Sequence, residues 1–177
     1  MAGNVVAFDL SLRNTGVGIF RYGWMHSTAS INTEKIKSYP DRLGAILKQV
    51  LIYVNAEDKV VIEDYAFHAN MNSLTVLAEL GGLVKFSLWR KTGSWPTLIN
   101  PATVKKWITG KGNAKKEDIK LAIYKKYKLE FPNSDEADAF ALGDLGWNLF
   151  YPNRQSRFLN SIEVEILGKI VKSKLKQ

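Results

Sequence analysis

The 177-residue sequence contains no cysteine. This absence excludes disulfide bonds and thiolate metal sites, and it suits a reducing cytoplasm, which would be the host cytoplasm if the protein is viral. No apolar stretch is long enough to span a bilayer, and the N-terminus lacks a basic segment followed by an apolar one. We therefore expect no membrane partner and no secretion signal, and one domain large enough for a sizeable core.

Acidic residues are outnumbered by basic ones. The chain has 17 Asp and Glu against 25 Lys and Arg, which gives a net charge of +8. Such a surplus attracts phosphate backbones, with an affinity that falls steeply as salt rises. Lysines gather in residues 105–128 and 169–176. Lysines on helices are also common on solvated faces, so the charge supports a nucleic-acid partner without proving one.

Four of the acidic residues lie at positions that suggest a shared site. Asp9 ends one apolar run, Glu63 ends a second, and Asp135 and Asp138 lie three residues apart on a predicted helix. Like charges a few ångströms apart cannot all stay ionised unaided, so a shared site would need a cation. The acids therefore imply Mg²⁺, with Mn²⁺ as a substitute, and the layout of a metal-dependent nuclease.

The segment around Asp9 predicts two strands joined by a hairpin. Asp9 follows the apolar run Val5–Phe8, and Ser, Asn and Gly residues separate it from a second short strand. Gly16 and Gly18 would let that second strand approach a neighbour closely or bend. The alternative is that Asp9 only caps the turn, which is the common role of Asp at a strand end.

Glu63 ends a run that is typical of a buried strand. The β-branched stretch Lys59–Ile62 is too short for a typical helix, and its last residue would fall at the carboxyl edge of the sheet, where α/β proteins bind ligands. Glu63 and Asp64 face opposite sides of an extended backbone, so only one can join Asp9. We select Glu63. A surface acid at a strand end is an equally common alternative for this segment taken alone.

Asp135 and Asp138 are predicted in the first turns of a helix. Asn133 followed by Glu136 has the form of a capping box, and a spacing of three places both aspartates on one face while Glu136 points elsewhere. The helix N-terminus favours their ionised forms. Acids in a first turn are also routine dipole partners, which explains Asp135 better than Asp138, because Asp138 precedes the apolar stretch 139–142.

Together, this order of acids resembles the RuvC-type Holliday junction resolvases of the ribonuclease H-like superfamily, a group with phage-type members. Residues 100–116 are similar to that family's valine-lysine helix, glycine loop and second lysine. On that similarity, Lys105 and Lys116 correspond to the family's basic residues beside the active site. The resemblance covers most of the chain and implies an α/β, ribonuclease H-like fold with a mixed central sheet flanked by helices.

The resemblance also implies a mechanism and partners. Asp9 would bridge two metal ions, and Glu63, Asp135 and Asp138 would complete their shells for hydrolysis of a phosphodiester in branched DNA, especially four-way junctions. Lys105 or Lys116 would stabilise charge that develops on the phosphate. A homodimer is implied, with the long helix predicted over 72–91 in its interface. The expected DNA-binding residues are Phe67, Lys105, Lys111, Lys115 and Lys116, with Tyr65 as the second candidate for an aromatic that acts on bases at the junction.

Two departures from the family pattern bear on the site. The family usually follows its first Asp with Pro-Gly, whereas Leu10 and Ser11 stand here, and only the later Thr15-Gly16 matches. Some relatives carry His in place of the final Asp, but both histidines here are far from Asp138 in the sequence. We therefore predict an all-carboxylate site.

The remaining sequence predicts a nuclease domain over 1–150 and, over 151–177, a polar linker followed by an amphipathic basic helix. A terminal helix docked on the domain is favoured over a DNA-binding arm or a dimer clasp. Helices are also expected over 41–56 and 114–128, and a last strand over 96–100.

Other functions stay open at this point. Actin-like ATPases and sugar kinases also begin with a strand, an Asp and a Gly-containing hairpin, but they need two such domains. A non-catalytic junction- or duplex-binding protein would explain the basic charge, although it gains nothing from clustered acids facing phosphates. A debranching nuclease or an RNase H-like nuclease acting on another nucleic-acid structure would use almost the same carboxylates.

Overall fold

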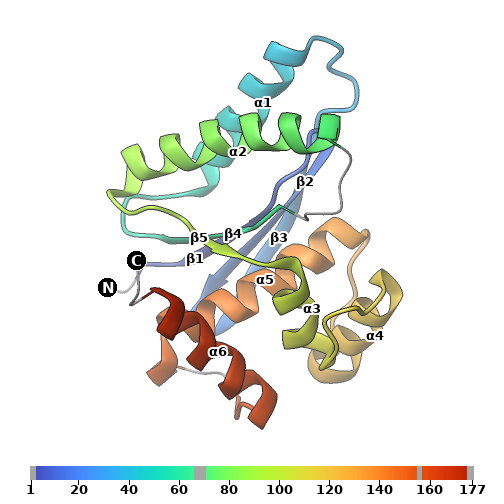
Figure 1. The fold of residues 1–177 in the computed structure, drawn as a ribbon, viewed down its shortest axis with the longest axis vertical. Helices are drawn as coiled ribbons and strands as arrows, with labels where there is room; N and C mark the ends of the chain where they lie inside the picture. The colour runs from blue at the N-terminus through green and yellow to red at the C-terminus, as the bar shows by residue number, and fades with distance from the viewer. Residues whose placement is uncertain (1–2, 66–70, 155–156, 175–177) are drawn as a thin grey trace.

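A computed structural model describes residues 3–65, 71–154 and 157–174 and has a five-stranded sheet between two layers of helices (Figure 1). The strands are β1 (Val5–Asp9), β2 (Asn14–Arg21), β3 (Trp24–Asn32), β4 (Lys59–Glu63) and β5 (Thr97–Ile99). The α-helices are α1 (Tyr39–Tyr53), α2 (Met71–Thr92), α3 (Pro101–Thr109), α4 (Lys116–Tyr127), α5 (Ser134–Phe150) and α6 (Ser161–Lys174), with a 3₁₀ turn, η1 (Pro152–Arg154), before α6.

The sheet is mixed, as the sequence predicted. Its strand order is β3-β2-β1-β4-β5. The first three strands form antiparallel pairs, whereas β1, β4 and β5 run parallel to one another. Parallel neighbours require crossover connections, and α1 and α2 provide them. The carboxyl ends of β1 and β4 therefore lie at the same edge of the sheet.

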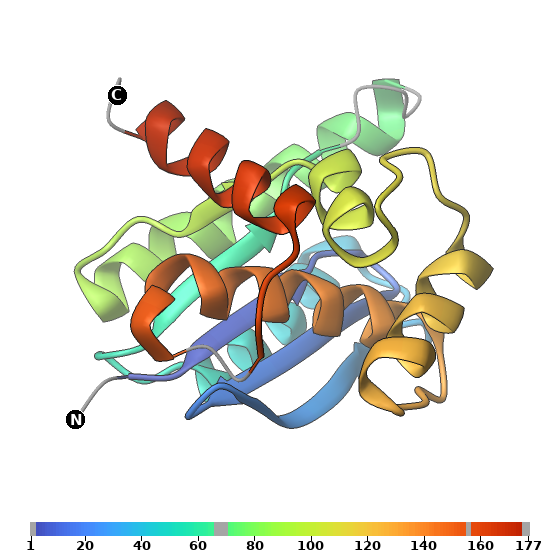
Figure 2. The same cartoon turned by 90° about the horizontal axis from the view of Figure 1, so that it is seen from below.

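Each face of the sheet carries its own core. Side chains alternate along β1, so that Val6 and Phe8 pack with α1 and α2, whereas Val5 and Ala7 pack with α3, α5 and α6. Figures 1 and 2 show α1 and α2 on one side of the sheet and α3 to α6 on the other. Helix α6 packs on α3 and α5, with Ile166 in the same core. The division of the chain near residue 150 stays a prediction.

Helix α5 lies close against β2 because two glycines leave room for it. A Cβ atom at Gly16 would lie 2.2 Å from the backbone oxygen of Asp135, and one at Gly18 would lie 2.7 Å from that of Ala139. These distances are far below any allowed contact, so only glycine fits. The close approach predicted from these glycines is observed, and it brings the N-terminus of α5 beside the end of β1.

The predicted elements are present, with small shifts of their ends. Helix α1 begins at Tyr39 because Pro40 is accommodated in its first turn. Strand β3 was not anticipated; it pairs with β2 along its whole length. Among the described residues, no helix is both long and apolar enough to cross a bilayer.

Candidate active site

The site is built at the edge of the sheet where β1 and β4 end. Asp9 is the last residue of β1 and Glu63 the last residue of β4, and the two strands are parallel neighbours with Phe8 opposite Ile62. Asp9 is also paired with Gly16 of β2, which touches the backbone of Asp135. Three elements that are distant in sequence therefore bring their acids to one place.

The start of α5 is fixed by its cap. Asn133 Oδ1 accepts a hydrogen bond from the Glu136 backbone N–H at 2.9 Å, and Asn133 Nδ2 donates to Glu136 Oε1 at 2.9 Å. Thr28 of β3 donates to the other Glu136 oxygen at 2.6 Å. This differs from the usual capping box, in which the acid accepts from the cap residue's backbone N–H. Glu136 is thus occupied by the cap, and Asp135 and Asp138 are the acids left on the other face.

Burial and mutual repulsion act together on the acids of this site. Burial, followed by the charges of Asp138 and Asp135, raises the pKa of Asp9 from 3.8 to about 7. Burial, followed by the charges of Asp9 and Asp138, raises the pKa of Glu63 from 4.5 to about 8. Burial and the charge of Asp135 also raise the pKa of Asp138, despite the opposing charge of Lys116. Without a cation the cluster therefore holds protons near neutral pH.

Lys116, the first residue of α4, lies beside Asp135 and Asp138. Its Nζ is 3.9 Å from Asp135 Oδ1 and 3.7 Å from Asp138 Oδ2, and its side chain is 60% exposed. Lys105 of α3 also acts on the acids, because its positive charge lowers the pKa of Glu63 and of Asp138. Both lysines thus add positive charge beside the acids.

The other predicted DNA-binding residues lie outside this centre. Lys111 is exposed in the loop after α3, and Lys115 is exposed at the N-cap of α4. Phe67 lies outside the described residues. Tyr65 packs on α2, where Lys85 Nζ lies 5.3 Å from the centre of its ring and where a Cβ atom at Gly81 would clash with its hydroxyl.

Asn14 is a site residue that the sequence did not identify. Its Nδ2 donates to Asp135 Oδ2 at 2.5 Å, across 121 positions of sequence. The turn after Asp9 holds Asn14 in place, since Ser11 Oγ accepts from its backbone N–H at 3.2 Å and Thr15 Oγ1 donates to the Ser11 carbonyl at 2.8 Å. The Leu10-Ser11 departure from Pro-Gly therefore gives an ordered turn. Asn in a turn is so common that its sequence carries no signal of this contact.

The donor set fits a hard divalent cation. Mg²⁺ prefers oxygen ligands, and burial together with the neighbouring acids raises the pKa of Asp9 and Glu63 despite the opposing charge of Lys116. Among the described side chains, no three acids or histidines are already arranged closely enough to enclose an ion. A cation would therefore draw the carboxylates together, and the protons held by Asp9 and Glu63 would be released.

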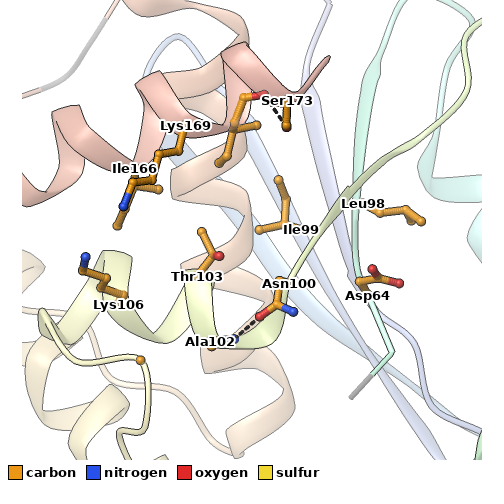
Figure 3. Close-up of a pocket in the computed structure, with 12 residues that line it drawn as sticks. Asp64, Leu98, Ile99, Asn100, Ala102, Thr103, Lys106, Ile166, Lys169 and Ser173 are labelled. Carbon is orange, nitrogen blue, oxygen red and sulfur yellow. Dashed lines mark hydrogen bonds between the residues drawn. The ribbon is translucent and has the colours of Figure 1, made fainter. Parts of the chain in front are cut away.

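Asp64 is separated from the other acids. It lines a cavity of about 500 Å³ between the end of β5, α3 and α6, together with Asn100, Thr103, Lys106 and Lys169 (Figure 3). The expectation that Glu63 and Asp64 face different sides agrees with this placement. The cavity lies beside the carboxylate centre and contains none of its four acids.

Comparisons with known proteins agree with this geometry. The family model described as crossover junction endodeoxyribonuclease RuvC matches residues 5–143. The RuvC of Sulfurovum sp. (strain NBC37-1) is 28% identical over 146 residues, which cover 78% of this chain and 91% of the relative. The RuvC of Campylobacter curvus (strain 525.92) is also 28% identical over 146 residues, with 78% and 92% covered.

Two solved structures share the fold. The RuvC structure of Thermus thermophilus superimposes with a TM-score of 0.69 at 20% identity and covers 85% of this chain and 95% of that one. T. thermophilus RuvC in complex with a Holliday junction substrate gives a TM-score of 0.67 at 20% identity, covering 80% and 91%. The predicted ribonuclease H-like fold is confirmed. With the family match over most of its length, the chain belongs to the RuvC family of crossover junction endodeoxyribonucleases.

Proposed function

We propose that this protein is a structure-selective DNA endonuclease that resolves Holliday junctions and other branched DNA by phosphodiester hydrolysis. The observation that carries the proposal is the convergence of Asp9, Glu63, Asp135 and Asp138 at one sheet edge, with pKa values of about 7 and about 8 at the first two. Burying several acids side by side is costly, and a non-catalytic DNA-binding protein would have no use for such a cluster. Membership of the RuvC family supports the same activity.

Asp9, Glu63, Asp135 and Asp138 would hold two Mg²⁺ ions, with Mn²⁺ able to substitute. When bound, the metal supplies an activated water and stabilises the leaving 3′-oxygen. Asn14 orients Asp135 through its 2.5 Å hydrogen bond to Oδ2, while Oδ1 lies 3.9 Å from the ammonium of Lys116. Removal of the Asn14 amide would leave the Asp135 carboxylate held, among the described side chains, by Lys116 alone.

The lysines bind and neutralise the phosphate. Lys116 reaches Asp135 and Asp138, so it can exchange this contact for a phosphate oxygen as charge develops in the transition state. Lys105 approaches the acids from α3. The exposed Lys111 and Lys115 extend the basic surface along the loop between the two helices and would contact the DNA backbone. Phe67 stays our candidate for the aromatic that acts at the junction.

A homodimer in the cytoplasm is the state in which we expect this activity. Helix α2 exposes 38% of Leu83, 54% of Phe86 and 42% of Trp89, and the rings of Phe86 and Trp89 pack with their centres 5.7 Å apart and their planes tilted by 43°. An exposed aromatic pair on a long helix is typical of a subunit interface. Two-fold symmetry would give two active sites for the paired strands of a four-way junction.

Cleavage of a labelled synthetic four-way junction, beside a linear duplex of the same sequence, tests the proposal. We expect Mg²⁺-dependent cutting of the junction and not of the duplex, and loss of cutting but not of binding in Asp9→Asn. The matched control is Asp64→Asn, which removes a neighbouring acid outside the centre and should still cut. Tight binding without cutting would instead favour an architectural junction-binding protein, and cutting of RNA–DNA hybrids would favour another substrate.

A further inference from the structure

A second group of buried charges lies behind the carboxylate centre. It joins α3, α4 and α5 to the C-terminal segment, and Glu163 and Asp144 are its buried acids, with only 0% and 3% of their surfaces exposed. We call it the buried ion cluster; its members are Trp107, Lys126, Tyr127, Asp144, Arg157 and Glu163. Arg157 and Glu163 lie beyond residues 5–143, the range matched by the family model.

Each acid of the buried ion cluster is bound by several side chains or backbone groups. Asp144 Oδ2 accepts from Trp107 Nε1 at 2.7 Å and from the Tyr127 hydroxyl at 2.7 Å, and Arg157 Nη2 approaches it at 3.4 Å. Glu163 accepts two bonds of 2.7 Å from the Arg157 guanidinium. It also accepts from Lys126 and, at 2.9 Å, from the Asn160 backbone N–H.

The other members of the buried ion cluster contact Trp107 of α3 from several sides. The Trp107 ring is 1% exposed, and the Arg157 guanidinium and the Lys126 ammonium each lie 5.8 Å from its centre. Its N–H is held by Asp144. The rotation of α3 about its own axis is therefore fixed by directional contacts in addition to apolar packing.

This rotation matters at the carboxylate centre. Lys105 precedes Trp107 by two residues, so the two side chains leave α3 in nearly opposite directions, about 200° apart. Lys105 therefore leaves α3 on the side away from the buried ion cluster, and its positive charge lowers the pKa of Glu63 and of Asp138. Any turn of α3 that moved Trp107 would move Lys105 away from them.

The other two helices of the cluster also carry site residues. Helix α4 begins at Lys116 and ends with Lys126 and Tyr127, and α5 carries Asp138 six residues before Asp144. Buried ion pairs rarely stabilise a fold more than apolar packing would, whereas their directional bonds can fix one arrangement among several. A cluster that joins these three helices is therefore suited to setting their relative positions.

We propose that Arg157 and Glu163 are positioning residues for catalysis: through Trp107, Tyr127 and Lys126 they hold Lys105 and Lys116 at the carboxylates. The C-terminal segment is then part of the catalytic apparatus, although it contributes no group to the reaction. This proposal rests on the proposed function, because cleavage is its main readout.

The test compares two Glu→Gln variants on the same helix. Glu163→Gln leaves Arg157 and Lys126 without their carboxylate, whereas Glu165→Gln removes an acid that is 47% exposed and bound to Lys106 and Lys169 outside the cluster. Single-turnover cleavage of the junction in Mg²⁺ and junction affinity in Ca²⁺ are measured at a temperature where circular dichroism finds each variant fully folded. Arg157→Lys is a milder second variant, since it keeps the charge but loses the paired bonds.

We expect Glu163→Gln to cut at least about tenfold more slowly with junction affinity nearly unchanged, because small misplacement of a positioned group costs rate more than binding. Arg157→Lys should also cut more slowly with junction affinity nearly unchanged, but to a smaller degree. Glu165→Gln should match the wild type in both cleavage rate and affinity. A lower melting temperature with an unchanged rate in the folded protein would overturn the proposal and leave the cluster a purely stabilising one.

A second readout separates this proposal from the proposed function. In ¹⁵N-labelled protein, the side-chain ammonium signals of Lys105 and Lys116 should shift in Glu163→Gln and stay unchanged in Glu165→Gln. If the wild type fails to cut any junction, the proposed function fails, and the lysine signals still decide whether the cluster positions the two side chains. Unchanged signals in Glu163→Gln would refute the positioning.

Discussion

Replacing Asp9 by Asn should make the metal-free protein more stable while it abolishes cleavage. Asp9 is ionised at pH 8 in a partly buried cluster with Asp135 and Asp138, and its pKa is raised from 3.8 to about 7. An acid with a raised pKa in the folded state destabilises the fold as pH rises, because the unfolded chain gives up the proton more easily. The penalty grows from about pH 4 and is complete above about pH 7. Asn carries no charge, so the variant does not lose stability in this way as pH rises.

The size of the effect follows from that pKa. A difference of about 3 pKa units between the folded and unfolded states corresponds to about 4 kcal/mol of unfolding free energy at pH 8. The wild type loses less unfolding free energy than this, because Glu63 can take up a proton in place of Asp9. The repulsion between the two carboxylates then falls. We therefore expect Asp9→Asn to gain about 2 kcal/mol, or about 5 °C in melting temperature for a chain of this length.

Urea and thermal unfolding in EDTA at pH 5 and pH 8 measure the gain. It should be larger at pH 8, because at pH 5 Asp9 is still mostly protonated in the folded protein. Addition of Mg²⁺ should reverse the order of stabilities, since an ion that binds only the folded state stabilises the wild type and the variant has lost one of its ligands. Asp64→Asn serves as the control and should show neither the gain nor the reversal.

The reasoning would be refuted by an Asp9→Asn protein that is less stable than the wild type at pH 8 without metal. That outcome would mean that the attraction of the Asp9 carboxylate to Lys116 outweighs its burial and its repulsion from the other acids. A gain of equal size at pH 5 and pH 8 would also contradict it, because the stabilisation would then have no electrostatic origin.

Three further substitutions test the packing of α5, the buried ion cluster and the exposed face of α2. Gly16→Ala should destabilise the fold by about 2 kcal/mol or more, measured by urea unfolding, because its Cβ would lie 2.2 Å from the Asp135 backbone oxygen. Burial alone would raise the pKa of Glu163, but its bonds from Arg157 and Lys126 lower it. The contribution of Glu163 to stability is thus present above its unfolded value of 4.5 and lost as pH falls below it, so the melting temperatures of wild type and Glu163→Gln should converge on acidification between pH 5 and pH 3. Phe86→Glu should convert a dimer to monomers in sedimentation, because a charge would replace an exposed aromatic of α2.

The acids could be found in the sequence because local patterns mark them. A β-branched run ending in Glu63 and a cap signal at Asn133 are short-range features, and both elements lie where the sequence predicts them. The spacing of Asp135 and Asp138 fixes their common face for the same reason. Family resemblance supplied what these patterns lack, namely that three separate segments meet.

Contacts between distant segments could not be predicted in this way. Strand β3 was missed because its polar residues, such as Ser27 and Thr28, resemble a loop, and its pairing with β2 forms only in the folded sheet. The bond of Asn14 to Asp135 and that of Trp107 to Asp144 join residues 121 and 37 positions apart. No local pattern encodes such pairs, since Asn in a turn and Trp on an apolar helix face have ordinary local explanations.

The burial of α5 has a consequence for how the protein loses activity. From Glu136 to Asn148 almost every residue of this helix is buried, and it packs against four strands as well as α3, α4 and α6. Its backbone amides can then exchange with solvent only when the whole domain opens, because no smaller opening would uncover them. Asp135 and Asp138 sit at the start of that helix, so on heating, the loss of cleavage should coincide with global unfolding and leave no temperature range in which the protein is folded but inactive.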